Sequence, residues 1–125
     1  MTEEKQEKVI YFCTQGGENP EKASIPFVMG SASLAMDIEA TVVLQGNGVF
    51  LAQPSYLKHI PQGGEFPQME KLVTDFMELG GKLVAFVPCM KDRNLEKSDL
   101  LEGVELTAAG KLVIAAIEAD AVLVY

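Results

Sequence analysis

The chain has 125 residues, 48% of them hydrophobic, with 18 acidic and 10 basic side chains and a net charge of −8. This length suits one compact domain, and we expect an α/β domain over residues 8–125 after a charged tail at residues 1–7. The acidic balance, without a cluster of Lys and Arg, argues against binding to nucleic acid. No apolar run approaches the roughly 20 residues that cross a bilayer, and the charged beginning does not resemble a secretory signal. We therefore expect a cytoplasmic protein without membrane contact.

The cysteine and histidine content excludes several metal and redox sites. The two cysteines, Cys13 and Cys89, lie far apart in the sequence and form neither a disulfide scaffold nor a C-x-x-C pair. With His59 as the single histidine, one chain cannot build a closed zinc site of two cysteines and two histidines. We expect no metal and no cofactor.

The first half of the chain predicts two strands and a helix. Lys8–Thr14 and Glu39–Gln45 are nearly continuous in apolar character, as in strands that are covered on both faces. A helix should begin at Asn19-Pro20-Glu21, which supplies an N-cap residue, a first-position proline and an acid in the first turn. Pro26 cannot donate to the carbonyl of Lys22, so we expect a kink or a late start there. The predicted core face of this helix is Ala23, Phe27, Gly30 and Leu34.

The second half predicts two further helices and three strands. One apolar stripe with helical spacing, stopped by Gly80-Gly81, is Phe66, Met69, Leu72, Val73, Phe76 and Leu79. A strand follows at Lys82–Val87, then a weaker candidate at Gly103–Leu106. The last helix should begin with Thr107 as its cap and run through Leu112, Val113, Ala116 and Ile117. Its small residues, which would allow close packing on the sheet, are Ala108, Ala109, Gly110, Ala115 and Ala116. The chain ends in a predicted strand, Ala121–Tyr125, covered like the others.

The alternation of strands and helices predicts an α/β fold with an open, wound, parallel sheet and helices on both faces. All strand-to-helix loops then meet at the carboxyl edge of the sheet, where such folds bind their ligands. The candidate binding residues in the first two loops are Thr14, Gly16, Gly17, Gly46, Asn47 and Gly48. The glycines permit positive φ and close approach of the backbone.

Cys89 is the candidate catalytic residue, because it follows the apolar run of the third strand at the expected start of a helix. Helix amides, with Lys91 or Arg93, would favour the thiolate, which is the nucleophilic form. Cys13 lies within the first strand, and we expect it to be buried. His59 either relays protons near this edge or is a solvated loop residue.

The sequence lacks the patterns of three better-known sites at such an edge. A P-loop is excluded because no glycine is followed by Lys and then Ser or Thr. The first loop has one hydroxyl and an acid, which disfavours a flavin phosphate, and it lacks the acidic cluster of a receiver domain. The apolar segment Val49–Ala52 is expected to line a pocket or a subunit contact. The charged residues Glu96, Lys97, Asp99 and Glu102 are expected to form a solvated face.

Four segments together resemble the DsrE/DsrF-like sulfur-relay family over nearly the whole chain. They are TQGGENPEK, VVLQGNGVFLA, VAFVPCMKDRNL and LTAAGKLVIAAIEADAVLVY. The resemblance implies a three-layer α/β/α domain, flavodoxin-like in architecture, with a five-stranded, mainly parallel sheet. It also implies assembly into homotrimers or homohexamers.

Sulfur-relay members of this family are similar in carrying a cysteine after the third strand that receives a persulfide from a donor protein and passes it to an acceptor protein. The matching position is Cys89, whereas Cys13 does not match and no second cysteine lies beside Cys89. Two hypotheses follow. One is a sulfur carrier, or sulfurtransferase-like protein, that acts through Cys89. The alternative is a non-catalytic oligomeric protein of the same fold that binds a small ligand or serves as a scaffold.

Overall fold

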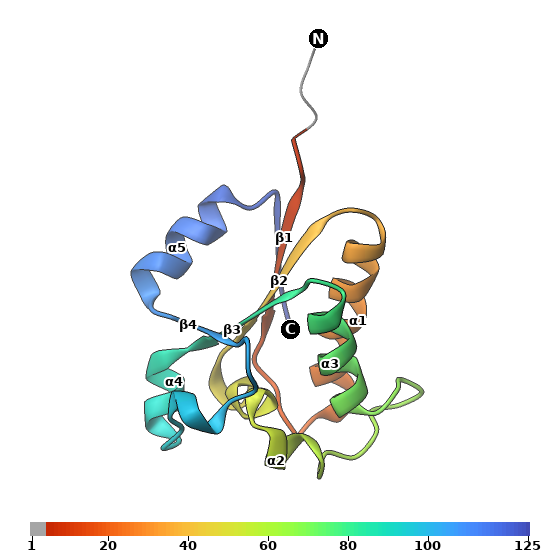
Figure 1. Ribbon diagram of the computed structural model, residues 1–125, viewed down its shortest axis with the longest axis vertical. Coiled ribbons are helices and arrows are strands. Elements are labelled where there is room, and N and C mark those ends of the chain that lie inside the picture. Colours follow the sequence, from red (N-terminus) through yellow and green to blue (C-terminus); the bar gives the residue numbers. More distant parts are fainter. Residues whose placement is uncertain (1–4) are drawn as a thin grey trace.

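The computed structural model describes residues 5–125, and part of the predicted charged tail, residues 1–4, lies outside the described residues. Five parallel strands form one sheet in the order β4-β3-β2-β1-β5 (Figure 1). The strands are β1 (Lys8–Cys13), β2 (Glu39–Leu44), β3 (Lys82–Phe86), β4 (Glu105–Thr107) and β5 (Ala121–Val124). The α-helices are α1 (Pro20–Ala35), α2 (Pro54–Leu57), α3 (Met69–Glu78), α4 (Val87–Asp92) and α5 (Ala109–Glu118). Two 3-10 helices are η1 (Gly46–Ala52) and η2 (Lys97–Asp99).

Helices cover both faces of the sheet, which confirms the predicted three-layer α/β/α fold. The two faces carry unequal numbers of helices. Helices α1 and α3 lie side by side on one face, and α5 lies alone on the other (Figure 1). Alternate side chains of β1 point to opposite faces of the sheet. Tyr11 and Cys13 belong to the main core under α1 and α3, while Ile10 belongs to a small cluster with Leu112 of α5. Most of the core therefore lies on one side of the sheet.

Helix α1 begins where the sequence predicts. Asn19 is its N-cap, with its side-chain oxygen accepting a hydrogen bond from the Lys22 amide at 3.2 Å, and Pro20 is the first helical residue. The helix is continuous through Pro26, so the predicted late start is wrong. Because the Pro26 ring is fully buried, its packing compensates for the missing helical hydrogen bond.

Helix α3 also ends where the sequence predicts. Gly80 adopts a left-handed φ of +98°, and the Gly81 amide donates to the Phe76 carbonyl at 2.9 Å. Two members of the predicted stripe lie outside the helix: Phe66 precedes it, and Leu79 is an exposed cap residue.

The C-terminal third of the chain differs most from the predictions. Thr107 is the last residue of β4, paired with Phe86, so the cap of α5 is Ala108 and the strand is Glu105–Thr107. Leu112 is the single buried residue of α5. Of the small residues expected on the sheet, Ala108, Ala109 and Gly110 are exposed, while Ala115 and Ala116 are partly covered.

All four residues of β5 are exposed, so the expected cover on both faces is wrong for this strand. The strand lies at the edge of the sheet, beyond β1 and β2, on which α1 packs. No helix within residues 5–125 is long and apolar enough to cross a bilayer.

Candidate functional site

The candidate site is the carboxyl edge of the sheet, formed by residues 14–19, 45–53 and 87–93. These segments follow β1, β2 and β3, which are neighbours in the sheet and run in the same direction. Their exits therefore lie side by side, at the lower end of the view in Figure 1.

A chain of polar side chains joins the three segments. Arg93 donates through Nε to the Asn47 side-chain oxygen at 3.1 Å, and the Asn47 amide donates to Glu18 Oε2 at 3.3 Å. The other Glu18 carboxylate oxygen accepts the Gly16 main-chain N–H at 2.8 Å. The network thus links Arg93 to Asn47, which lies 46 positions earlier in the sequence. Charged groups stand at its two ends, Arg93 and Glu18, and hydrogen bonds to charged groups are stronger than those between neutral groups.

An aromatic pair supports this network from η1 and α2. Phe50 stacks on Tyr56 with ring centroids 4.9 Å apart, and the Arg93 guanidinium lies 5.9 Å from the centre of the Phe50 ring. The Tyr56 hydroxyl accepts the Gly17 main-chain N–H at 2.8 Å. A Cβ on Gly17 would lie 2.8 Å from that oxygen, so a larger residue there would displace the Tyr56 hydroxyl from this hydrogen bond.

Cys89 lies in the first turn of α4, which begins at Val87, two residues earlier than the sequence suggested. Its side chain is partly buried and packs against the main core. Its carbonyl oxygen accepts a hydrogen bond from Arg93 Nη1 at 3.1 Å. Arg93 therefore fixes the backbone of Cys89 relative to Asn47 and brings a cation into the same turn.

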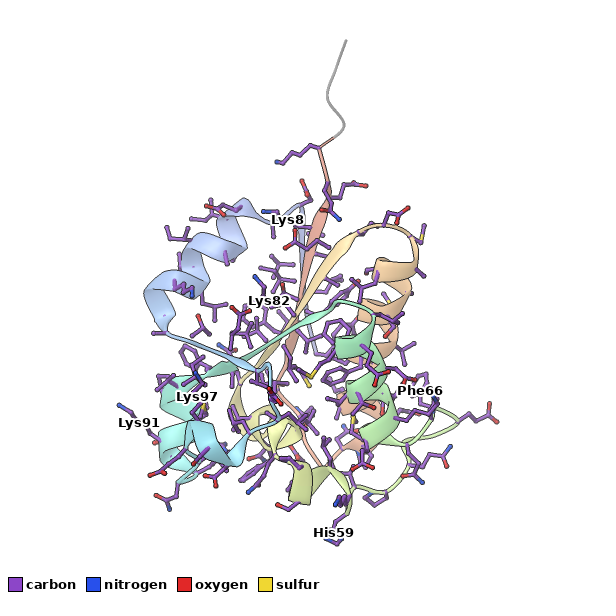
Figure 2. All side chains as sticks on the ribbon, viewed as in Figure 1. Lys8, His59, Phe66, Lys82, Lys91 and Lys97 are labelled. Carbon is purple, nitrogen blue, oxygen red and sulfur yellow. The ribbon has the colours of Figure 1, made fainter. Side chains whose placement is uncertain are left out.

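The structure does not bring all predicted site residues together. Lys91 and His59 are exposed and point away from the fold (Figure 2). Thr14 Oγ1 donates to the Tyr125 carbonyl at 2.7 Å and so connects the end of β1 to the end of β5. Strand β5 lies on the opposite side of β1 from β2 and β3, so this contact points away from Cys89. Gly46 adopts a φ of +55°, and Gly48 lies against the Cys13 carbonyl. With the aromatic pair included, the network contains Gly16, Gly17, Asn47 and Arg93 from the predicted set.

Two residues of the network, Glu18 and Tyr56, were not predicted as site residues, and Phe50 belongs to the segment that was expected at a pocket or subunit contact. In the sequence, Glu18 indicates only an acid that would repel a phosphate, and Tyr56 belongs to no periodic pattern. The segment Val49–Ala52 was expected at a pocket or subunit contact. Instead Val49, Leu51 and Ala52 are fully buried in the main core.

Cys13 differs sharply from Cys89, because its side chain has no exposed surface. Burial raises the pKa of the Cys13 thiol to about 12, above its ordinary value of 9.0. The thiol donates instead to main-chain carbonyls, with the Gln15 oxygen 3.6 Å from the sulfur. The expected burial of Cys13 is confirmed.

In the native protein, iodoacetamide is expected to alkylate Cys89 and to leave Cys13 unmodified until urea unfolds the chain, as read by peptide mass spectrometry.

The raised pKa of Cys13 also affects stability, because the unfolded thiol ionises near pH 9.0 while the folded thiol keeps its proton. The contribution of the protonated Cys13 thiol to the free energy of unfolding is therefore fully present below pH 9 and is lost as the pH rises toward 12. Between pH 8 and pH 10 the free energy of unfolding should fall by about 1 kcal/mol more in the wild type than in Cys13→Ala. Equal slopes would contradict this prediction.

Metal coordination finds no support at this edge. Among residues 5–125, no three His, Cys, Asp or Glu side chains gather as metal ligands would.

The DsrE/DsrF-like family model matches residues 7–125, which is nearly the whole chain. The chain belongs to the DsrE/DsrF-like family. This DsrE/DsrF-like protein is 28% identical over 118 residues to the uncharacterized protein MJ0989 of Methanocaldococcus jannaschii, covering 94% of this chain and 99% of that protein.

Two solved structures resemble this DsrE/DsrF-like protein in fold. The E. coli ychN protein matches with a TM-score of 0.76 and 17% identity, covering 97% of this chain and 100% of that one. The Methanobacterium thermoautotrophicum protein MTH1491, of unknown function, matches with a TM-score of 0.70 and 15% identity, covering the same shares. At these identities the likeness concerns the fold, and it agrees with the three-layer architecture.

Proposed function

We propose that this protein is a sulfur carrier, which receives a sulfur atom on Cys89 as a persulfide and passes it to an acceptor protein. Membership of the DsrE/DsrF-like family supports a role related to sulfur relay. The observation that carries the proposal is the contrast between the two cysteines. Cys89 has exposed surface at the carboxyl edge, whereas Cys13 has none.

The proposed chemistry is an exchange between thiolates and persulfides. The Cys89 thiolate attacks the outer sulfur of a donor persulfide, R–S–SH. The donor S–S bond breaks, a new S–S bond forms on Cys89, and the donor leaves as the thiolate R–S⁻. An acceptor thiolate then attacks the outer sulfur of the Cys89 persulfide, and Cys89 is released as a thiolate. Each step moves one sulfur atom, and no external oxidant or reductant is required.

The network around Arg93 would keep Cys89 in position for this exchange. Arg93 holds the Cys89 carbonyl and the Asn47 side chain at the same time, each at 3.1 Å. We expect the protein to act in the cytoplasm, where free thiols stay reduced.

The proposal is tested with glutathione persulfide as the donor and intact mass spectrometry as the readout. The wild type and Cys13→Ala are expected to gain one sulfur atom, and Cys89→Ser is expected to gain none. Added glutathione should then remove the sulfur from the wild type. A wild type that gains no sulfur, or a Cys89→Ser variant that gains as much as the wild type, would contradict the proposal.

The second candidate is a non-catalytic binding or scaffold protein. The packing of Cys89 against the main core favours it, because a partly buried thiol can act as a small apolar side chain. In that case iodoacetamide should modify Cys89 in the native protein no faster than Cys13. Replacement of Cys89 by alanine should then change neither assembly nor partner binding. Rapid modification of Cys89 would count against this candidate.

A further inference from the structure

A cavity of about 200 Å³ lies between α5 and the sheet, on the face opposite the main core, and we name it the α5 cavity. Its floor is apolar and consists of four buried residues, Ile10, Val43, Val84 and Leu112. The charged side chains that line it are Lys8, Glu39, Lys82, Glu105, Lys111 and Glu118. An apolar floor with a few charged groups around it is typical of a site for a small molecule.

The sheet register explains why charged side chains line this cavity. Lys8 at the start of β1 pairs with Glu39 of β2, and Lys82 of β3 pairs with Thr41. Paired residues of parallel strands point to the same face, and within residues 5–125 α5 is the one helix over this face (Figure 1). Figure 2 shows Lys8 and Lys82 between α5 and the strands. The beginnings of the strands therefore present polar side chains to an open space and not to a packed helix.

The charges in the α5 cavity are balanced, with three lysines and three glutamates among the lining residues. Lys82 and Glu105 form an ion pair, with 3.8 Å between the nitrogen and the oxygen. Within residues 5–125, Lys8 and Glu39 form no ion pair, although they are neighbours in the register. Because neighbouring strands lie only about 4.8 Å apart, one small ligand can contact both groups at once.

We propose that the α5 cavity binds a free α-amino acid with an apolar side chain, such as leucine. The Lys8 ammonium donates hydrogen bonds to the carboxylate of the ligand, and the Glu39 carboxylate accepts them from its ammonium group. The apolar side chain of the ligand lies on Val84 and Leu112, where its surface is removed from water. Each charged group of the ligand thus has a partner of opposite sign.

Size and charge both favour this class of ligand. An apolar cavity of ~150 Å³ holds benzene, whereas drug-sized ligands occupy pockets of roughly 300–1,000 Å³. A cavity of about 200 Å³ therefore suits a molecule of amino-acid size. The net charge of −8 repels anions, but a zwitterion carries no net charge and approaches without this penalty.

The α5 cavity is separate from the edge that carries Cys89. Cys89 packs against the main core, whereas the cavity lies on the other face of the sheet. Lys8 and Glu39 stand at the beginnings of their strands, at the end of the sheet opposite the carboxyl edge. Binding of an amino acid there goes beyond the proposed sulfur transfer and is tested independently of it.

Isothermal titration calorimetry of the wild type with L-leucine tests the proposal. Two analogues with the same apolar part are the ligand controls: isocaproate lacks the ammonium group, and isoamylamine lacks the carboxylate. Leucine is expected to bind with a Kd of about 1 mM or tighter, and each analogue at least tenfold more weakly, because each leaves one charged partner unmatched. Absence of saturable heat with leucine, or an analogue that binds as well as leucine, overturns the proposal.

Lys8→Gln and Glu39→Gln test where leucine binds, with Lys22→Gln as the matched control. Lys22 is exposed on α1, in the layer on the other side of the sheet. Each of the first two changes is expected to raise the Kd for leucine by about tenfold, and Lys22→Gln should leave it unchanged. If all three variants bind leucine like the wild type, the placement in the α5 cavity is wrong.

A measurement on the wild type alone serves if a variant fails to fold by circular dichroism. Leucine should shift the amide signals of residues in the cavity in two-dimensional NMR spectra, with the largest changes at Thr41, Val43, Val84 and Leu112. Signals of α1 and α3, in the other layer, should stay in place. Shifts confined to residues outside the cavity overturn the proposal.

Discussion

Replacement of Phe76 by alanine is expected to destabilise the protein by about 3–5 kcal/mol. The Phe76 ring has no exposed surface and meets Phe27 of α1 edge to face, with ring centroids 5.7 Å apart and planes at 81°. Two glycines, Gly30 and Gly81, leave the space that the ring fills. A Cβ on Gly30 would lie 2.7 Å from a Phe76 ring carbon. Alanine would leave a cavity where α1 and α3 meet.

Urea unfolding of the wild type and the variant at the same protein concentration measures this effect. Leu79→Ala in the same region is the control, since Leu79 is 59% exposed and should change the unfolding free energy by less than about 0.5 kcal/mol. Similar losses in the two variants would show that Phe76 does not carry the packing of α1 against α3.

Replacement of Gly48 by alanine is expected to cost about 2 kcal/mol and to disturb the carboxyl edge. A Cβ on Gly48 would overlap the carbonyl oxygen of Cys13. That oxygen accepts the Gln45 N–H at 3.0 Å, so neither backbone segment can move without losing a hydrogen bond. The adjacent residue Asn47 would shift with Gly48, which should weaken its contact with Arg93.

Gly110→Ala is the control for Gly48→Ala, because a Cβ on Gly110 meets no atom within 4 Å. In the first turn of α5 this change should stabilise the protein by less than about 1 kcal/mol. The readouts are urea unfolding and the rate at which iodoacetamide modifies Cys89. If both glycine variants behave alike, the close approach of η1 to β1 does not constrain this edge.

The fold was predictable where local signals agree with tertiary packing. The start of α1 at Asn19-Pro20 and the end of α3 at Gly80-Gly81 depend on capping and left-handed backbone, and these are local properties. The order of the strands is not a local property, and the sequence left it open. Thr107 looked like a helix cap, but pairing with Phe86 placed it in the sheet.

The candidate site was predictable at the level of loops and less so at the level of side chains. Parallel strands bring their exits together, so Asn47 and Arg93 were placed at one edge from the strand pattern alone. Glu18, Phe50 and Tyr56 could not be assigned to a network, because their contacts depend on how η1 and α2 fold back over the first loop. Likewise, the exposure of β5 depends on which strands the helices cover, and its apolar composition does not reveal that.

The pairing of β1 with β5 also has a consequence for biosynthesis. Val9 lies opposite Ala121, so one side of the first strand gains its neighbour only when the last strand has left the ribosome. Until then, the nascent chain presents the unpaired N–H and C=O groups of β1 to other polypeptides. Closure of such a distant pair also slows folding, because a long loop must be ordered before the contact forms. We therefore expect β5 to add last to a preformed β1-β2-β3 unit.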